Sequence, residues 1–292
     1  MRYRVRHVTT CAYSTPVLVS HHAARLIPRE TERQRCLDAS LSVEPAPAAR
    51  ADRVDYFGNP VSFLTIQTSH RVLTVIAESH VEVAPPPAAD PLATPPWEAV
   101  RAALACPADA PALEAAEFLC DSPFAAASDD LRAYARPSFA PGRPVLDAAF
   151  DLTRRIHADF QYDPAATTVS TPLAQVLAMR RGVCQDFAHL QIACLRAMGL
   201  AARYVGGYLL TRPPPGQAKL VGADASHAWV SVWIPGRGWV DLDPTNDMLV
   251  GDEHVTCAWG RDYEDVSPVK GQVVGGGEHA LTVSVDVRVD EG

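Results

Sequence analysis

The sequence lacks the cysteine spacings that disulfide scaffolds and metal sites use. Its seven cysteines are an odd number, and neither they nor the ten histidines form a CxxC or HExxH pattern. Disulfide-rich domains pair their cysteines, whereas free thiols persist in reducing compartments. We therefore expect unpaired cysteines, no metal ion and no bound cofactor.

Basic stripes and long apolar runs are also missing. The net charge is −8, from 26 Lys and Arg against 34 Asp and Glu, and no cluster of basic side chains marks a surface for nucleic acid. Residues 1–7 contain no apolar run of signal-peptide length, and no segment is long enough for a membrane span. These features predict a cytoplasmic protein that binds neither nucleic acid nor membrane. They leave the oligomeric state open.

Three regions of the chain differ in composition. Residues 1–84 contain alternating, strand-like runs separated by turn signals, which predict a β-sandwich domain. Residues 85–96 form a proline-rich linker, because six prolines fall within positions 84–96. Residues 97–292 mix helical and strand patterns and predict an α+β domain. A last alternating run at 280–289 predicts one half-buried strand, and it fits either sheet.

Cys184 opens a predicted helix. Apolar residues recur at helical spacing from Val183 to Met198, and Gly199 follows where helices commonly stop. The first turn of a helix has free N–H groups, whose field favours a thiolate and whose protons can stabilise an oxyanion. Gly182 would let the backbone approach a substrate carbonyl. The alternative is a buried structural cysteine, because free cysteine is among the most buried residue types.

His227 and Asp243 fall on two strand patterns that flank a Pro-Gly turn and predict a β-hairpin. The two side chains share one face of the hairpin if the loop has three or five residues. If the loop has two or four residues, they lie on opposite faces unless a bulge intervenes. An odd loop sets Asp243 diagonally beside His227 and leaves Asp241 about 7 Å further away. The alternatives are an ordinary hydrogen-bonded strand histidine and an Asp-Pro turn.

Three motifs together resemble the core of the transglutaminase-like superfamily, in particular its bacterial cysteine peptidase branch. They are GVCQDFA at 182–188, SHAWV at 226–230 and GWVDLDPT at 238–245. Weaker similarities at 55–60, 160–164, 260–263 and 267–271 extend the resemblance to an N-terminal β domain. The resemblance implies a papain-like α+β core with Cys184 as nucleophile, His227 as base and Asp243 as the residue that orients it.

The implied chemistry is acyl transfer through a thioester on an amide of a peptide or protein substrate. Water as acceptor gives a peptidase or amidase, which the resemblance favours, and an amine gives crosslinking. A non-catalytic binding or scaffolding module is the third possibility, disfavoured by the intact triad. Tyr162 is a candidate oxyanion donor, because superfamily members use an upstream aromatic or amide side chain. Trp229 either lines an acyl-binding groove or packs in the core.

A calcium loop is disfavoured. Asp241, Asp243, Thr245 and Asp247 have the alternate spacing of such a loop, but Asn246 replaces its glycine and Pro244 interrupts it.

Overall fold

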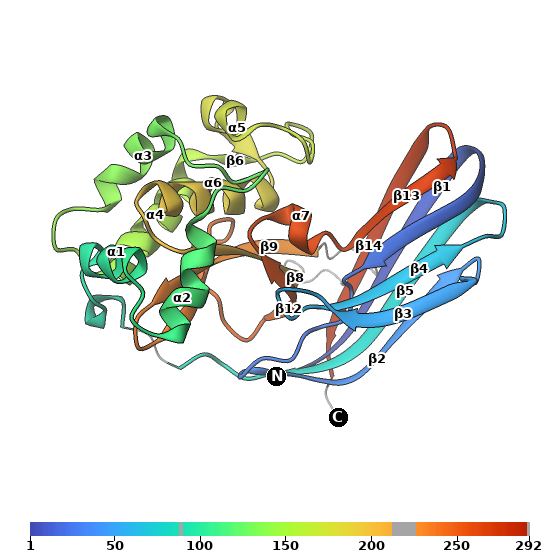
Figure 1. Ribbon diagram of the computed structural model, residues 1–292, viewed down its shortest axis with the longest axis horizontal. Coiled ribbons are helices and arrows are strands. Elements are labelled where there is room, and N and C mark those ends of the chain that lie inside the picture. Colours follow the sequence, from blue (N-terminus) through green and yellow to red (C-terminus); the bar gives the residue numbers. More distant parts are fainter. Residues whose placement is uncertain (88–89, 212–225, 291–292) are drawn as a thin grey trace, which may run out of the picture.

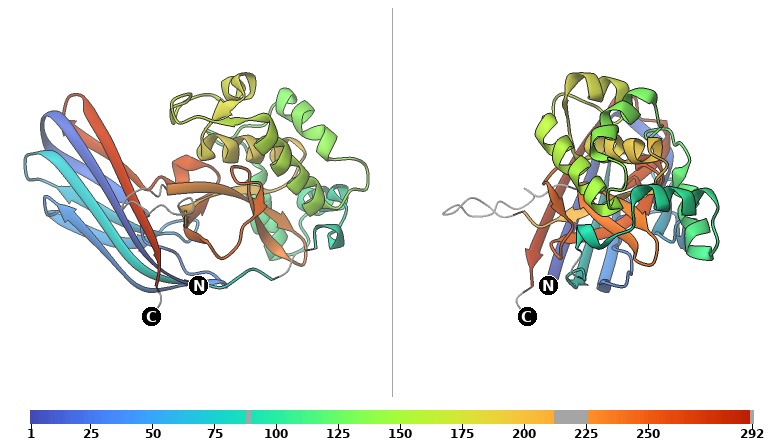
Figure 2. Two further views of the ribbon diagram at one scale, coloured as in Figure 1. Left: turned by 180° about the vertical axis from the view of Figure 1, so that it is seen from behind. Right: turned by 90° about the vertical axis from the view of Figure 1, so that its left-hand side faces the viewer.

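The computed structural model describes residues 1–87, 90–211 and 226–290. Two parts lie side by side, an elongated β-sheet domain and a mixed domain in which helices surround a smaller sheet (Figure 1). Views from behind and from the end show the same division (Figure 2). The two ends of the chain lie close together, because Tyr3 pairs with Val289 in neighbouring strands.

The β-sheet domain is organised around one long strand, β1 (Arg2–Ala24). The remaining strands are β2 (Gln34–Glu44), β3 (Ala49–Val54), β4 (Pro60–Ile66), β5 (His70–Val83), β13 (Val269–Gly275) and β14 (His279–Val289). The first half of β1 pairs with β5 and β14, and its second half pairs with β4 and β13. An irregularity between Ala12 and Val17 separates the halves. The antiparallel sheet curls, so that Leu64 and Ile66 of β4 share a sandwich-like core with Leu73 of β5.

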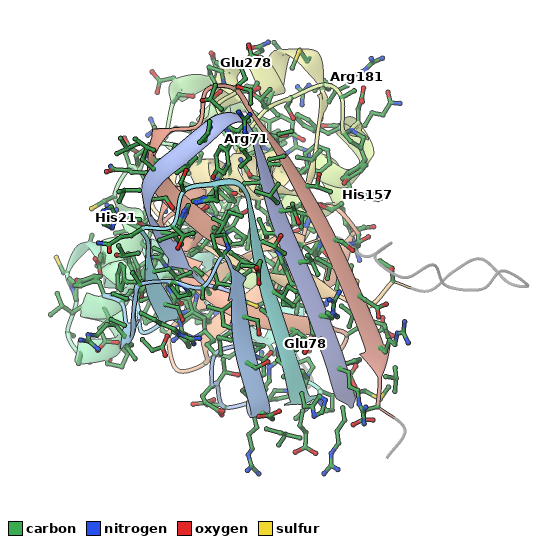
Figure 3. The ribbon with its side chains drawn as sticks, turned by 90° about the vertical axis from the view of Figure 1, so that its right-hand side faces the viewer. His21, Arg71, Glu78, His157, Arg181 and Glu278 are labelled. Atoms are coloured by element: carbon green, nitrogen blue, oxygen red, sulfur yellow. The ribbon has the colours of Figure 1, made fainter. Side chains whose placement is uncertain are left out.

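The two faces of this sheet follow the alternation of the sequence. Along β1, Tyr3 and Val5 are buried, whereas Arg4 and Arg6 are exposed, because successive strand residues point to opposite faces. The outer face carries charged side chains paired across strands (Figure 3), including Arg6 with Glu78 at 3.1 Å. The inner face is left to apolar packing.

Both C-terminal strands belong to this sheet. The sequence left the partner of residues 280–289 open, and β14 pairs with β1. The expectation that all of 97–292 forms one α+β domain is wrong for residues 269–275, because β13 also pairs with β1. The physical reason is that β1 offers two hydrogen-bonding edges along its whole length, and β4 and β5 occupy only one of them at each end.

The mixed domain is built around helix α6 (Cys184–Ala197). The other helices are α1 (Trp97–Ala105), α2 (Ala110–Ala116), α3 (Asp129–Ala135), α4 (Val145–Asp159), α5 (Leu173–Met179) and α7 (Tyr263–Val266). Short 3₁₀ turns lie at Pro91–Ala93, Glu117–Leu119 and Arg136–Ser138, the first of them within the proline-rich linker. Among the described residues, no helix is long and apolar enough to cross a membrane.

A five-stranded antiparallel sheet supports α6 on one side. Its strands are β8 (Ala202–Leu209), β9 (Ser226–Ile234), β10 (Gly238–Asp243), β11 (Met248–Leu249) and β12 (His254–Gly260), in the order β11-β10-β9-β8-β12. Helices α3, α4 and α5 cover the other side of α6. A short parallel pair, β6 (Gln161–Tyr162) and β7 (Arg181–Gly182), leads into the helix. This is the predicted α+β core, in which the helix that begins at Cys184 packs on an antiparallel sheet.

Two buried amide side chains join the domains. Strand β12 is an edge strand, so its outer backbone groups need partners from elsewhere. The amide of Gln34 donates to the carbonyl of Thr256 at 2.7 Å and accepts from its N–H at 2.8 Å. The amide of Asn59 pairs with the N–H and carbonyl of Trp259 at 2.9 and 2.8 Å. Each amide therefore replaces part of a missing strand and fixes the β-sheet domain against the mixed domain.

Candidate active site

Cys184 is the first residue of α6, as the sequence predicts. The turn before it is held by the buried carboxylate of Asp186, whose Oδ2 accepts from the N–H of Val183 at 2.8 Å and from the hydroxyl of Thr167 at 2.6 Å. Burial raises the pKa of Asp186, and the two hydrogen bonds oppose that shift. Asp186 therefore caps the start of α6 and fixes the position of the thiol.

Gly182 is required by this capping arrangement. A Cβ atom at position 182 would lie 2.6 Å from Oδ2 of Asp186 and 2.9 Å from its Cβ. The sequence suggested that this glycine brings backbone close to a substrate. The structure shows a different reason, which is the close approach of the capping carboxylate.

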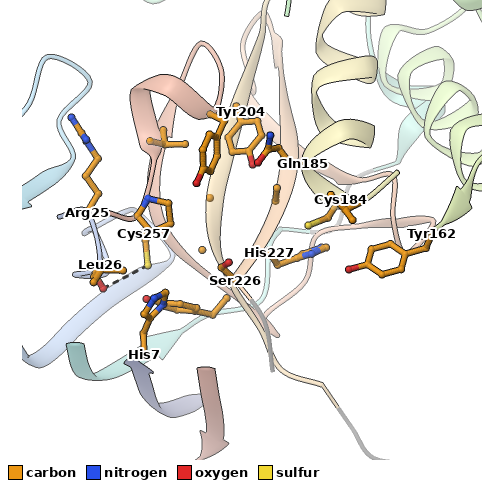
Figure 4. Close-up of a pocket in the computed structure, with 18 residues that line it drawn as sticks. His7, Arg25, Leu26, Tyr162, Cys184, Gln185, Tyr204, Ser226, His227 and Cys257 are labelled. Carbon is orange, nitrogen blue, oxygen red and sulfur yellow. Dashed lines mark hydrogen bonds between the residues drawn. The ribbon is translucent and has the colours of Figure 1, made fainter. Parts of the chain in front are cut away.

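The β9–β10 hairpin has the three-residue loop that shared facing requires. Ile234 pairs with Gly238 and Ser231 pairs with Asp241. As a result Nε2 of His227 lies 2.7 Å from Oδ2 of Asp243. The thiol of Cys184 lies beside the same ring in one pocket (Figure 4), and it contributes to the raised pKa of His227. Because Nε2 faces Asp243, Nδ1 is the nitrogen available to the thiol. The structure thus brings together the three residues that the sequence singled out.

Asp243 is fully buried and accepts five hydrogen bonds. His254 Nε2 and Asn246 Nδ2 lie 3.1 and 2.7 Å from Oδ2, in addition to His227. The backbone N–H groups of Thr245 and Asn246 donate to Oδ1 at 2.9 and 3.2 Å. Sequence reasoning missed His254 and Asn246 as members of the site. Asn246 had a local signal, since it follows the Asp-Pro turn, whereas His254 lies on β12 and had none.

This network determines the charge of both partners. Burial disfavours the ionised carboxylate, but the donors from His227, His254 and Asn246 outweigh it and hold the pKa of Asp243 far below its usual range. Burial likewise opposes a charged imidazole. Hydrogen bonds and electrostatic attraction from Asp243 and Cys184 outweigh that cost and raise the pKa of His227 to about 10. The imidazolium form of His227 is therefore favoured at neutral pH.

Asp241, the rival orienting residue, is engaged elsewhere. Its carboxylate accepts from the hydroxyl of Ser231 and from Nε1 of Trp229, the latter at 3.4 Å. Trp229 itself is fully buried and packs with Val205 and Val250. Of the two roles left open for Trp229, the structure has the core one, because the side chain is fully buried beneath the hairpin and does not line the pocket.

Tyr162 lies beside the thiol, as a candidate oxyanion donor should. Strand β6 pairs Tyr162 with Gly182, two residues before Cys184. The side chain is half exposed and lines the same pocket as Cys184 and His227. Burial and the neighbouring Cys184 raise the pKa of Tyr162, so its hydroxyl keeps the proton that a donor needs. Its contact with an oxyanion stays a prediction.

His227, Asp243 and His254 place three potential metal-ligating atoms within 4.8 Å of one another. Both imidazole Nε2 atoms already point to the same carboxylate oxygen. This hydrogen-bond network accounts for the cluster without an ion.

Comparison with known proteins agrees with the fold. Residues 3–82 match the bacterial transglutaminase-like N-terminal region, and residues 132–244 match the transglutaminase-like superfamily. An uncharacterised protein of Mycobacterium tuberculosis is 46% identical, with 100% of this chain and 94% of the relative covered. The chain therefore belongs to the transglutaminase-like superfamily and carries the N-terminal region of its bacterial members.

Two further similarities are informative. A solved structure from Cytophaga hutchinsonii, described as "a putative cysteine protease", has a TM-score of 0.77 at 23% identity and covers 99% of this chain and 90% of its own. It shows the shared fold. A protein-glutamine gamma-glutamyltransferase of Pseudomonas aeruginosa is 32% identical over 123 residues, which cover 36% of this chain and 18% of the relative.

Proposed function

We propose that this protein cleaves amide bonds by thiol catalysis, with Cys184 as nucleophile, His227 as proton carrier and Asp243 as the residue that orients His227. The observation that carries the proposal is a set of three groups: the thiol and the imidazole line one pocket, and the imidazole is hydrogen-bonded to a buried, ionised carboxylate. Such a set is the arrangement that activates a nucleophile and its base in acyl-transfer enzymes. We also propose that the protein acts in the cytoplasm and that its substrate is a peptide or a protein.

In the proposed reaction, His227 holds the proton of Cys184 and the sulfur attacks the carbonyl carbon of the substrate. The oxyanion is stabilised by N–H groups in the first turn of α6 and by the hydroxyl of Tyr162. His227 then gives its proton to the leaving amine as the C–N bond breaks, which leaves a thioester on Cys184. Water, deprotonated by His227, attacks the thioester and releases a carboxylic acid and the free thiol.

Hydrolysis and transfer differ only in this second half of the reaction. An amine that reaches the thioester before water would form a new amide. The partial similarity to the Pseudomonas glutamyltransferase supports transfer as the second candidate. The fold shared with the Cytophaga protein is compatible with both.

The test measures both outcomes on the same protein substrate. Casein with a quenched fluorophore reports hydrolysis, and incorporation of a dansylated amine into casein reports transfer. We expect hydrolysis to dominate and Cys184→Ala to abolish it, with mass spectrometry detecting a thioester on Cys184 in the wild-type protein. Cys106→Ala is the matched control, because Cys106 is exposed and does not line the pocket.

Three results would count against the proposal. Turnover that survives in Cys184→Ala would refute the nucleophile. If amine incorporation exceeds hydrolysis, the proposed function changes from hydrolysis to acyl transfer. A thiol that forms no thioester and yields neither product would favour the binding or scaffolding module.

A further inference from the structure

The pocket at Cys184 continues to the β-sheet domain. Its volume is about 280 Å³, and its wall includes His7, Arg25 and Leu26 from β1 and the segment that follows it. Figure 4 shows Cys184, His227 and Tyr162 grouped at one end of the pocket and Arg25, Leu26 and Cys257 at the other. The N-terminal domain therefore forms the wall opposite the thiol.

Among the residues that the structure describes, the far end of the pocket presents no uncompensated charge. Arg25 is bound to Asp55 at 2.9 Å, so its charge is compensated. His7 contacts the hydroxyl of Thr9 at 2.8 Å, and burial lowers the pKa of His7 to about 4. Burial also raises the pKa of Cys257 to about 12. At neutral pH both groups are uncharged, so a charged ligand group placed there would lose water without gaining an opposite charge.

The floor of the pocket is opened by Gly206. It lies on β8 between Tyr204 and Tyr208, which share its face of the strand because side chains alternate. Gly206 is partly exposed, whereas Val205 and Gly207 are buried. The missing side chain therefore leaves room between two aromatic rings.

Space at Gly206 is available to a side chain. A Cβ at this position would meet only Val266 and Tyr204, at 3.7 and 3.8 Å, which is ordinary contact. At Gly207 a Cβ would lie 1.9 Å from the carbonyl oxygen of Val255, so that glycine is needed for packing. Gly206 is thus the glycine that can be enlarged to fill the pocket without disturbing the sheet.

We propose that this pocket is a specificity subsite that takes one uncharged aromatic side chain of the acyl donor, next to the carbonyl that Cys184 attacks. The proposal rests on the proposed thiol chemistry. The volume lies just below the range of about 300–1,000 Å³ typical of small-ligand sites, which suits a single large side chain. Tyrosine rings and aliphatic groups line it, and such surfaces favour an aromatic partner.

The domain contacts hold this wall in place. Gln34 and Asn59 fix β12, which carries Cys257. Tyr3 and Val5 of β1 share a buried apolar cluster with Tyr208 of β8. The β-sheet domain therefore forms and holds one wall of the proposed substrate site.

The test labels Cys184 in the full-length protein with N-acetyl aminoacyl chloromethyl ketones, which alkylate the thiol and release chloride. Phenylalanine, alanine, glutamate and lysine derivatives are compared by mass spectrometry, and each rate is divided by the rate with iodoacetamide. We expect the phenylalanine reagent to exceed the alanine reagent by about 10- to 100-fold, the effect of burying one large apolar side chain. The glutamate and lysine reagents should not exceed alanine.

Gly206→Leu should reduce the ratio of phenylalanine to alanine to about one, because its side chain would occupy the subsite. Gly251→Leu makes the same chemical change at a position with no atom within 4 Å of a new Cβ, and it should leave the ratio unchanged. If Gly206→Leu does not fold, Leu26→Trp narrows the pocket from the β-sheet side and carries the same expectation.

A wild-type ratio near one, or a folded Gly206→Leu that keeps the preference, would overturn the subsite. Neither result would touch the proposed function, which is judged by Cys184-dependent turnover of casein. If the wild-type protein shows no Cys184-dependent turnover of casein but still prefers the phenylalanine reagent, the proposed function fails, and the pocket is confirmed as a binding site for an aromatic side chain.

Discussion

The buried carboxylate of Asp243 offers the sharpest test of the site, through the substitution Asp243→Asn. Its Oδ1 accepts from two backbone N–H groups, which cannot move away. The amide oxygen of an asparagine must therefore take that place, and its NH₂ group must face Nε2 of His227. An NH₂ group only donates, so Nε2 of His227 must accept its hydrogen bond. A neutral imidazole in which Nε2 is the acceptor carries its proton on Nδ1.

That exchange of tautomer removes the base from the thiol. Nδ1 is the nitrogen available to Cys184, and a protonated Nδ1 in a neutral ring cannot accept the thiol proton. An equivalent tautomer error in a serine-protease triad lowers kcat about 10⁴-fold, and we expect a loss of at least about 10³-fold here. One charge-assisted hydrogen bond contributes roughly 1.5–3 kcal/mol, so stability should fall by an amount of that order.

The assay follows casein hydrolysis together with the iodoacetamide labelling rate of Cys184 as a function of pH. In the wild type, activity should persist until His227 loses its proton near pH 10. Burial lowers the pKa of His227, but Asp243 and Cys184 outweigh burial and raise the pKa to about 10. In Asp243→Asn the alkaline limit should move to lower pH, because the negative charge that raised the pKa of His227 is gone.

Asp241→Asn is the matched control. Asp241 lies on the same strand and the same face, but it accepts from Ser231 and Trp229 instead of His227. It should keep the labelling rate and pH profile of the wild type. Equal losses in the two variants, or an unchanged pH limit in Asp243→Asn, would refute the tautomer argument.

Three other outcomes are expected. At pH 6 iodoacetamide should label Cys184 faster than the exposed Cys106, which serves as the internal reference; equal rates would contradict an activated thiol. The pKa of His227, raised to about 10, means that its contribution to stability is complete below about pH 6.5 and disappears as the pH rises toward 10. Chemical unfolding across that range should therefore show a steeper loss for the wild type than for His227→Gln, and parallel curves would argue against the raised pKa. Gly182→Ala should cost about 1–3 kcal/mol and slow Cys184 labelling, because the new Cβ displaces the Asp186 carboxylate; a variant with wild-type stability and labelling would show that the turn tolerates the shift.

The sequence by itself determined the local elements of the site. The helical period after Val183 and the stop at Gly199 predicted α6 with Cys184 at its first position, as the structure has it. Strand parity predicted that a three-residue loop would place His227 beside Asp243 and leave Asp241 apart. These conclusions hold because side-chain direction within one helix or one hairpin depends only on spacing along the chain.

Only the tertiary structure decided which distant segments meet. An alternating pattern shows that a strand has one buried face, but the partner on its hydrogen-bonding edge is chosen by packing. The pairing of β1 with β13 and β14 could not be derived in this way. The same holds for His254 on Asp243, for the burial of Trp229, and for the wall that His7 and Leu26 build opposite Cys184. Each of these depends on contacts between residues far apart in the chain, where spacing carries no information about direction or distance.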